Sequence, residues 1–124
     1  MPKILVVEDE PENQLAIRVI LTVEGFEVVS VEDGRLALQA AQEQQPDLIL
    51  LDVMMPEING FEVLAQLRQH ETTRGIPVIM LTALAQRADV AKAVEAGVDD
   101  YVAKPFEPDD LIERIRKAIG KRHP

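Results

Sequence analysis

The chain has 124 residues, a length typical of one domain, and no cysteine, which excludes disulfides, thiol catalysis and cysteine-held metals. Its net charge of −9, from 13 basic and 22 acidic side chains, disfavours binding to bare nucleic acid and to anionic membranes. The first apolar run, Ile4–Val7, is too short for a signal peptide or a membrane span. We therefore expect a cytoplasmic protein with no membrane contact.

Short apolar runs alternate along the chain with longer segments of helical periodicity. The runs predict strands at Ile4–Val7, Val28–Val31, Leu48–Leu51, Val78–Leu81 and Tyr101–Ala103. The first, third and fourth runs are nearly all apolar, which is typical of strands covered on both faces. The second and fifth runs are weaker, and we expect them at the edges of the sheet.

Five helices are predicted, each from apolar residues at helical spacing with a glycine or proline at one end. Their apolar stripes begin, in chain order, at Leu15, Leu36, Phe61, Val90 and Leu111. Their expected ends are Gly25, the residue before Pro46, the stretch near Gly75, Gly97 and Gly120, and Pro108 is expected to start the last helix.

This alternation predicts an α/β fold of one domain over residues 1–124. We expect a doubly wound, five-stranded parallel sheet in the order 2-1-3-4-5, within a flavodoxin-like three-layer sandwich with five helices. Ligands of such sheets bind beyond the carboxyl ends of the strands, where the strand order reverses. That point lies beside the first and third strands.

Charged and polar residues follow directly after the predicted strands. Glu8 and Asp9 follow the first strand, Asp52 the third, Thr82 the fourth and Lys104 the fifth. All should project from one edge of the sheet. Two carboxylates about 4 Å apart repel by roughly 4 kcal/mol at an effective dielectric constant of 20, so they need a shared proton or a divalent cation. With oxygen ligands alone, Mg²⁺ is the natural cation.

Asp52 is the candidate nucleophile of this group. A carboxylate beside a metal and an ammonium can attack a phosphorus centre and form an aspartyl phosphate, with Lys104 offsetting the phosphoryl charge. The Thr82 hydroxyl could bond a new phosphoryl oxygen. Taken singly, the acids could simply cap the next helix, Thr82 could be an ordinary strand end, and Lys104 could lie in a plain loop.

These residues lie in short motifs spread over essentially the whole chain. The motifs are Val6–Glu10, Leu51–Pro56, Asn59–Glu62, Leu81–Ala83, Ala96–Tyr101 and Lys104–Phe106. Together they resemble the response-regulator receiver domain of two-component signalling. The family fold is the 2-1-3-4-5 sandwich that the strand pattern also favours.

The resemblance implies roles for the residues that match the family motifs. Asp52 would be the phosphoacceptor, and Lys104 would contact the phosphoryl group. Glu8, Asp9, Asp52 and the backbone carbonyl of Met54 would hold Mg²⁺, for which Mn²⁺ could substitute. Aspartate is more usual in the family at the position of Glu8, whose longer side chain could reach the metal through water.

Switching and partners are also implied by the resemblance. Thr82 and Tyr101 would form the switch pair, and the signal would pass through the fourth helix, fifth strand and fifth helix to an output protein or domain. The phosphoryl group would come from a histidine kinase or a histidine phosphotransfer domain. The chain would be a signalling switch rather than an enzyme, with no direct nucleic-acid binding, and either a monomer or a weak phosphorylation-dependent homodimer.

Such a dimer could use charged residues of the signalling face. The candidates for pairs across it are Lys92, Asp99, Asp100 and Arg114. Exposed ion pairs of this kind are weak and common on protein surfaces.

Other classes remain open. A flavodoxin-like cofactor binder fits the fold, but the acids after the first strand would repel a phosphate. Nucleotide binding lacks a glycine-rich or Walker motif. An aspartyl phosphatase would want a general acid where Met54 stands. A docking module that is not phosphorylated, or a receiver from the start of a longer DNA-binding regulator or hybrid kinase, is also compatible with the sequence.

Overall fold

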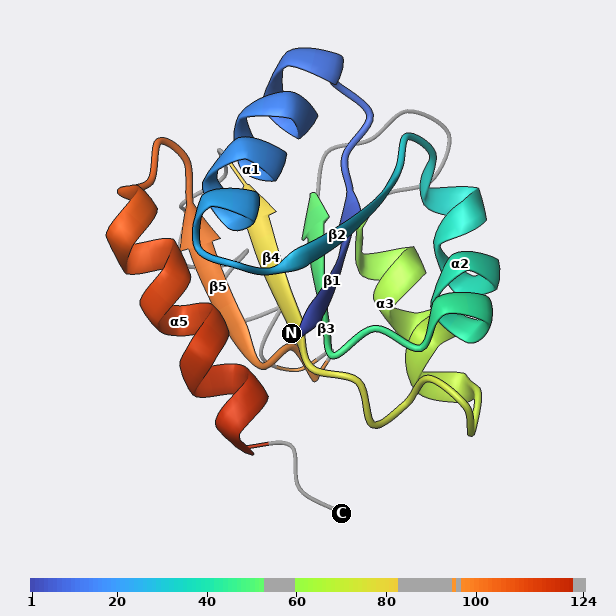
Figure 1. Cartoon of the computed structure of the whole chain (residues 1–124). Coiled ribbons are helices and arrows are strands. Elements are labelled where there is room, and N and C mark those ends of the chain that lie inside the picture. Colours follow the sequence, from blue (N-terminus) through green and yellow to red (C-terminus); the bar gives the residue numbers. More distant parts are fainter. Residues whose placement is uncertain (53–59, 83–94, 96, 122–124) are drawn as a thin grey trace.

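The structure, a computed structural model, describes residues 1–52, 60–82, 95 and 97–121. Its centre is a five-stranded parallel sheet in the order β2-β1-β3-β4-β5, as predicted. The strands are β1 (Lys3–Val7), β2 (Glu27–Val31), β3 (Leu48–Asp52), β4 (Val78–Thr82) and β5 (Asp100–Ala103). Every neighbouring pair is parallel, as the arrowheads of β3 and β4 show in Figure 1, so the carboxyl ends of the strands meet at one edge of the sheet.

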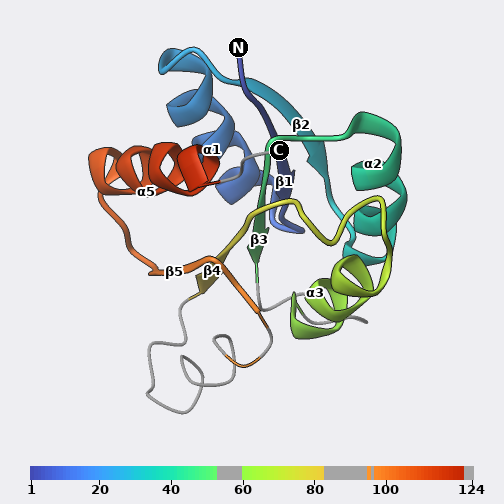
Figure 2. The same cartoon turned by 90° about the horizontal axis from the view of Figure 1, so that it is seen from below.

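Helices cover both faces of this sheet. They are α1 (Pro11–Val23), the 3₁₀ turn η1 (Gly34–Leu36) with α2 (Ala37–Gln44), α3 (Gly60–Gln69) and α5 (Pro108–Lys121). Figures 1 and 2 show α1 and α5 on one face and α2 and α3 on the other, which confirms the three-layer sandwich. The fourth helix, predicted from Val90, lies outside the described residues. Within the described part of the chain, no helix is long and apolar enough to cross a membrane.

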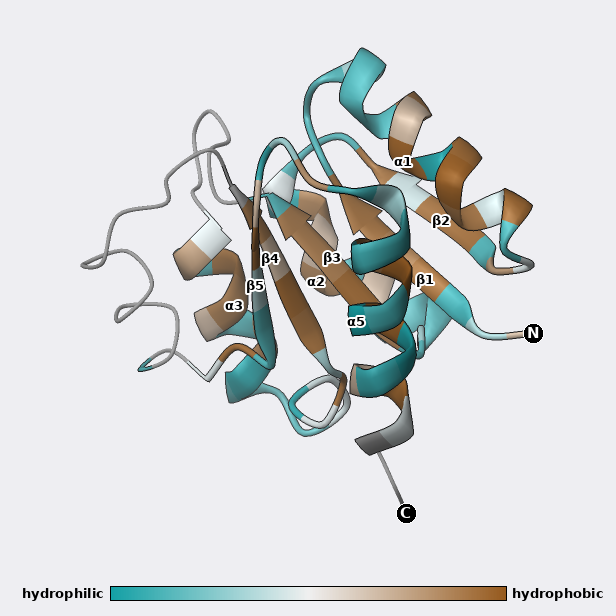
Figure 3. Cartoon of the chain, turned by 90° about the vertical axis from the view of Figure 1, so that its left-hand side faces the viewer, coloured by the Kyte–Doolittle hydropathy of each residue, from teal (hydrophilic) through white to brown (hydrophobic). Residues whose placement is uncertain are grey.

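Alternate residues of the central strands supply two separate cores. Leu5, Ile49 and Met80 pack with α2 and α3, whereas Val6 and Leu50 pack with α1 and α5. Figure 3 shows the strands as predominantly hydrophobic, with a hydrophilic outer side on α5. Burial of β3 on both faces explains why its run is continuously apolar. The charged residues of the site therefore lie at the ends of the strands.

The helix ends follow local chemistry. α1 ends just before Gly25, whose φ of +90° suits the predicted glycine stop. The predicted third helix was too long: α3 ends at Gln69, because the Thr73 hydroxyl donates to the Leu67 carbonyl at 2.6 Å and closes the helix end. Gly120 does not end the last helix, since α5 continues to Lys121.

The strand register brings the expected site residues to one level. Val7 pairs with Leu51, so Glu8 and Asp52 stand at equivalent positions just beyond that pair. Thr82 pairs with Ala103, the residue before Lys104. Residues that are far apart in the sequence thus reach the same edge of the sheet.

Candidate functional site

Three carboxyl groups meet beyond the carboxyl ends of β1 and β3. One oxygen each of Glu8, Asp9 and Asp52 lies within 4.8 Å of the others. Glu8 and Asp52 are buried, whereas Asp9 is partly exposed. The structure therefore confirms the grouping of these acids that the strand ends predicted.

Lys104 supplies a positive charge to the cluster. Its Nζ donates to Glu8 Oε1 at 3.0 Å and lies 3.7 Å from Asp52 Oδ2. The Glu8 side chain is only 1% exposed, so this is a largely desolvated ion pair. The peptide bond between Lys104 and Pro105 is cis. Lys104 thus contacts two of the three acids directly.

Glu8 is held by both its backbone and its carboxylate. Its N–H donates to the Val31 carbonyl at 3.1 Å, and its Oε2 accepts from the Glu10 N–H at 3.2 Å. Burial alone raises the pKa of Glu8, but hydrogen bonding with Asp52, Lys104 and the Glu10 N–H outweighs it, and the pKa lies below its ordinary value. The fold therefore favours the ionised form of Glu8.

Asp9 has the opposite shift. Burial raises the pKa of its carboxyl, and hydrogen bonding with Glu8 and the charge of Glu8 raise the pKa further. An ionised Asp9 therefore lacks a compensating cation in the described structure, apart from a longer-range contribution from Lys104. A cation that entered the cluster would stabilise this charge.

The cluster fits a hard divalent cation. When all groups are ionised, three carboxylates and one ammonium leave a local charge of −2. The donors are all oxygens, which is the ligand chemistry of Mg²⁺, and an edge position leaves room for water and a phosphoryl oxygen. A soft or nitrogen-preferring metal would find no suitable ligand among these side chains.

The remaining predicted site residues are placed only in part. Met54 lies outside the described residues. Thr82 ends β4, two residues beyond Met80, which pairs with Tyr101. Tyr101 is half-buried and packs against the core on the α2 and α3 side. Thr82 and Tyr101 therefore occupy diagonal positions on neighbouring strands.

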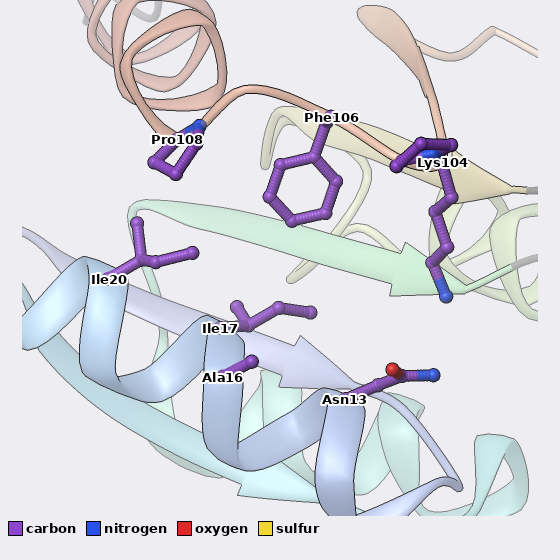
Figure 4. A pocket seen from close by; sticks show the side chains of 8 residues that line it. Asn13, Ala16, Ile17, Ile20, Lys104, Phe106 and Pro108 are labelled. Carbon is purple, nitrogen blue, oxygen red and sulfur yellow. The ribbon is translucent and has the colours of Figure 1, made fainter.

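An apolar cavity of about 540 Å³ adjoins Lys104. It lies between α1 and the segment that leads from β5 to α5, as Figure 4 shows, and it is lined by Asn13, Ala16, Ile17, Ile20, Lys104, Pro105, Phe106 and Pro108. This cavity was not predicted from the sequence. A signal existed in the spacing of residues 13, 16, 17 and 20, which share one side of α1.

The charged residues proposed for a dimer have partners within the chain instead. Arg114 Nη1 donates to Asp100 Oδ1 at 2.8 Å, and Arg68 Nη2 donates to Asp99 Oδ2 at 3.0 Å. Lys92 lies outside the described residues. These intrachain pairs give no support to the expectation that the same groups pair between two copies.

Comparison with known proteins agrees with this geometry. A family model described as the response regulator receiver domain matches residues 4–116. The DNA-binding response regulator MtrA of Mycolicibacterium smegmatis is 44% identical over 119 residues, covering 96% of this chain and 51% of that protein. The transcriptional regulatory protein KdpE of Mycobacterium tuberculosis is 42% identical over 121 residues, covering 98% of this chain and 52% of that protein. The chain thus spans about half the length of these curated relatives.

Solved structures show the same architecture. The receiver domain of the sensor histidine kinase PA1611 from Pseudomonas aeruginosa, with a magnesium ion coordinated in its active site cleft, is 38% identical, with a TM-score of 0.90 and coverage of 97% of this chain and 98% of that one. The receiver domain of the Francisella response regulator 1452 is 31% identical, with a TM-score of 0.92 and coverage of 99% and 100%. Sequence, fold and the acidic edge agree: this chain belongs to the response regulator receiver domain family.

Proposed function

We propose that this receiver domain accepts a phosphoryl group on Asp52 in a Mg²⁺-dependent reaction. The observation that carries the proposal is the meeting of Asp52, Glu8, Asp9 and Lys104 at one edge of the sheet. A nucleophilic carboxylate, a site for a divalent cation and an ammonium are the groups that phosphoryl transfer to a carboxylate needs.

Each residue has a distinct part in this transfer. An Asp52 oxygen attacks the phosphorus of a phosphohistidine, so an O–P bond forms as the N–P bond breaks. The leaving imidazole keeps the electron pair of that bond and departs neutral with a proton on its other nitrogen. Lys104 moves its hydrogen bond from Glu8 towards the phosphoryl oxygens and offsets their charge.

Mg²⁺, when bound, stabilises the charge on the transferring phosphoryl oxygens. Glu8, Asp9 and Asp52 would hold it, with the Met54 carbonyl as a further ligand that the family resemblance implies. Mn²⁺, which accepts the same oxygen ligands, would substitute. Glu8 is well suited to this role because its pKa is lowered, which keeps its carboxylate ionised.

The proposed donor is a histidine kinase or a histidine phosphotransfer domain. The apolar cavity beside Lys104 supports a protein donor, because an apolar surface placed there would lie next to the phosphorylation site. Phosphorylation would then draw Thr82 towards the phosphoryl group and change the position of the Tyr101 ring. This movement would change the surface that binds an output partner. We propose that these 124 residues themselves contact no nucleic acid, given the net charge of −9, although the relative MtrA is a DNA-binding response regulator.

The test is intact-mass measurement after incubation with acetyl phosphate, with and without Mg²⁺. We expect one added phosphoryl group in the wild type with Mg²⁺, and none in Asp52→Asn or without Mg²⁺. Lys104→Met should label at least tenfold more slowly, since it removes the charge that offsets the transferring group.

Beryllofluoride binding in the presence of Mg²⁺ distinguishes two reasons for a failure to label. Either acetyl phosphate is a poor phosphodonor for this chain, or Asp52 is not the phosphoacceptor. The wild type should bind this phosphoryl mimic and Asp52→Asn should not. Labelling that survives in Asp52→Asn, or a wild type that neither labels nor binds beryllofluoride, would overturn the proposal in favour of a docking module.

A further inference from the structure

Gln14, near the start of α1, contacts the ends of two strands of the sheet. Its side-chain Nε2 donates to the Glu8 carbonyl at 3.2 Å and to the Val31 carbonyl at 3.4 Å. These carbonyls lie at the carboxyl ends of β1 and β2, where the ladder between the two strands stops. The backbone N–H of Gln14 also donates to the Glu10 carbonyl at 2.9 Å, which fixes this turn of α1 above the strand ends.

The chemistry of an amide suits this position. A primary amide has two N–H donors on one nitrogen, so it can serve two neighbouring carbonyls at once. A hydroxyl offers one donor and a carboxylate offers none. Gln14 therefore continues the pairing of β1 with β2 by one step beyond the Glu8 N–H bond to Val31.

This contact acts on the acidic cluster through the backbone. The Glu8 carbonyl belongs to the peptide unit that joins Glu8 to Asp9, and that unit is planar. Holding the carbonyl therefore restrains the orientation of the whole unit, and with it the directions from which both side chains leave the backbone. The Glu8 carboxylate can then lie 3.0 Å from Lys104 while Asp9 faces the same cluster.

We propose that Gln14 is a positioning residue for the acidic site, one that contacts neither the metal nor the phosphoryl group. This inference rests on the proposed Mg²⁺ site. It assigns to Gln14 the task of keeping Glu8 and Asp9 oriented for one cation, and it predicts that losing the amide weakens Mg²⁺ binding even in a folded protein.

The first test compares Gln14→Met with the wild type and with Gln39→Met. Methionine keeps the length of the side chain and removes both donors. Gln39 is an exposed glutamine of α2 whose amide donates to Glu43, so it controls for the same substitution on a helix surface. In a Mg²⁺ titration followed by NMR, Gln14→Met should raise the Kd for Mg²⁺ roughly tenfold, as loss of an outer-shell partner does, whereas Gln39→Met should leave it unchanged.

A second variant distinguishes the loss of the amide donors from the effect of added charge on Mg²⁺ binding. Gln14→Glu has the same shape but no donor, and its added negative charge alone would tighten Mg²⁺ binding. The positioning role predicts weaker binding in Gln14→Glu as well. Tighter or unchanged binding in both Gln14 variants, with the wild type binding Mg²⁺ normally, would overturn the inference. A wild type that does not bind Mg²⁺ would instead overturn the proposed function.

A measurement on the unmodified protein does not depend on whether the variants fold. If the Gln14 amide is held by two carbonyls, its side-chain N–H protons should exchange with water several-fold more slowly than those of Gln39. Equal exchange rates for the two amides would contradict the contact on which the inference depends.

Discussion

The carboxyl groups of Glu8 and Asp9 are adjacent in sequence, but their pKa values are shifted in opposite directions. Glu8 points into the protein and has an ammonium and a backbone N–H as partners, so its pKa is lowered despite burial. Burial raises the pKa of Asp9, and the neighbouring Glu8 carboxylate raises it further. One step along the backbone thus changes which protonation state the fold favours, because neighbouring residues face different surroundings.

The raised pKa of Asp9 predicts a stability effect. The folded protein binds the Asp9 proton more tightly than the unfolded chain, whose carboxyl titrates near 3.8. Ionisation of Asp9 therefore lowers the free energy of unfolding, and this loss develops as the pH rises through the folded-state pKa. Without Mg²⁺ at pH 7, Asp9→Asn should raise Tm by roughly 2–5 °C.

Differential scanning calorimetry across pH provides the measurement. The gain in Tm should disappear near pH 3, where Asp9 is protonated in both the folded and the unfolded state. At pH 7, saturating Mg²⁺ should make Tm higher for the wild type than for Asp9→Asn, because only the wild type keeps all the metal ligands. Glu71→Gln, which removes an exposed charge elsewhere, should change Tm little. A lower Tm for Asp9→Asn at pH 7 without Mg²⁺ would show that the acid is satisfied by the fold.

At the scale of elements, Arg68 joins α3 to the beginnings of β4 and β5. Its guanidinium donates to the Ile76 carbonyl at 2.7 Å, the Gly97 carbonyl at 3.0 Å and Asp99 Oδ2 at 3.0 Å. Asp99 Oδ2 in turn accepts from the Val78 N–H at 2.8 Å. Arg68 therefore ties together three segments at the edge of the sheet opposite the acidic cluster.

Replacing Arg68 should release this junction. Arg68→Met keeps the apolar stem of the side chain but removes every hydrogen-bond donor. We expect the free energy of unfolding to fall by about 1–2 kcal/mol, near the low end of the range for hydrogen bonds of charged groups, because the site is partly exposed. Urea denaturation measures this change. Arg74→Met, at an exposed arginine nearby, should stay within about 0.5 kcal/mol of the wild type. Equal losses in the two variants would mean that the guanidinium contacts contribute nothing specific.

At the scale of the whole molecule, the sheet connects the acidic edge to the face that carries Tyr101. Asp52 and Thr82 end β3 and β4, and Tyr101 lies in β5 beside β4. A switch from 1:99 to 99:1 between two states needs about 5.5 kcal/mol of differential stabilisation. Charge-assisted bonds to a phosphoryl group on Asp52 could supply a good part of that energy.

The single tyrosine of the chain makes this coupling measurable. Adding Mg²⁺ and beryllofluoride should change the fluorescence of Tyr101, because a ring that is half-buried at rest changes its surroundings when the switch moves. Asp52→Asn should show no change, and Thr82→Val should show a smaller one. A wild type that binds beryllofluoride without any change at Tyr101 would contradict the switch role of this residue.

The fold could be predicted almost entirely from sequence. Continuous apolar runs such as Leu48–Leu51 identify strands buried on both faces, and the edge positions of the second and fifth strands follow from their weaker runs. Helix ends were predicted less accurately. The end of α3 depends on a bond from Thr73 to the Leu67 carbonyl, which residue spacing does not reveal.

Sequence by itself determined the positions of the strands, the acids at the strand ends and the resemblance to the receiver family, because periodicity and short motifs are local properties of the chain. The strand order was predicted from the apolar runs together with that resemblance. Only the tertiary structure decided how the site residues contact one another. The Lys104 bond to Glu8, the Gln14 bonds to two strand ends and the cavity beside α1 join residues up to 96 positions apart. Such contacts depend on side-chain direction and burial, which the three-dimensional packing of the sheet and its helices sets.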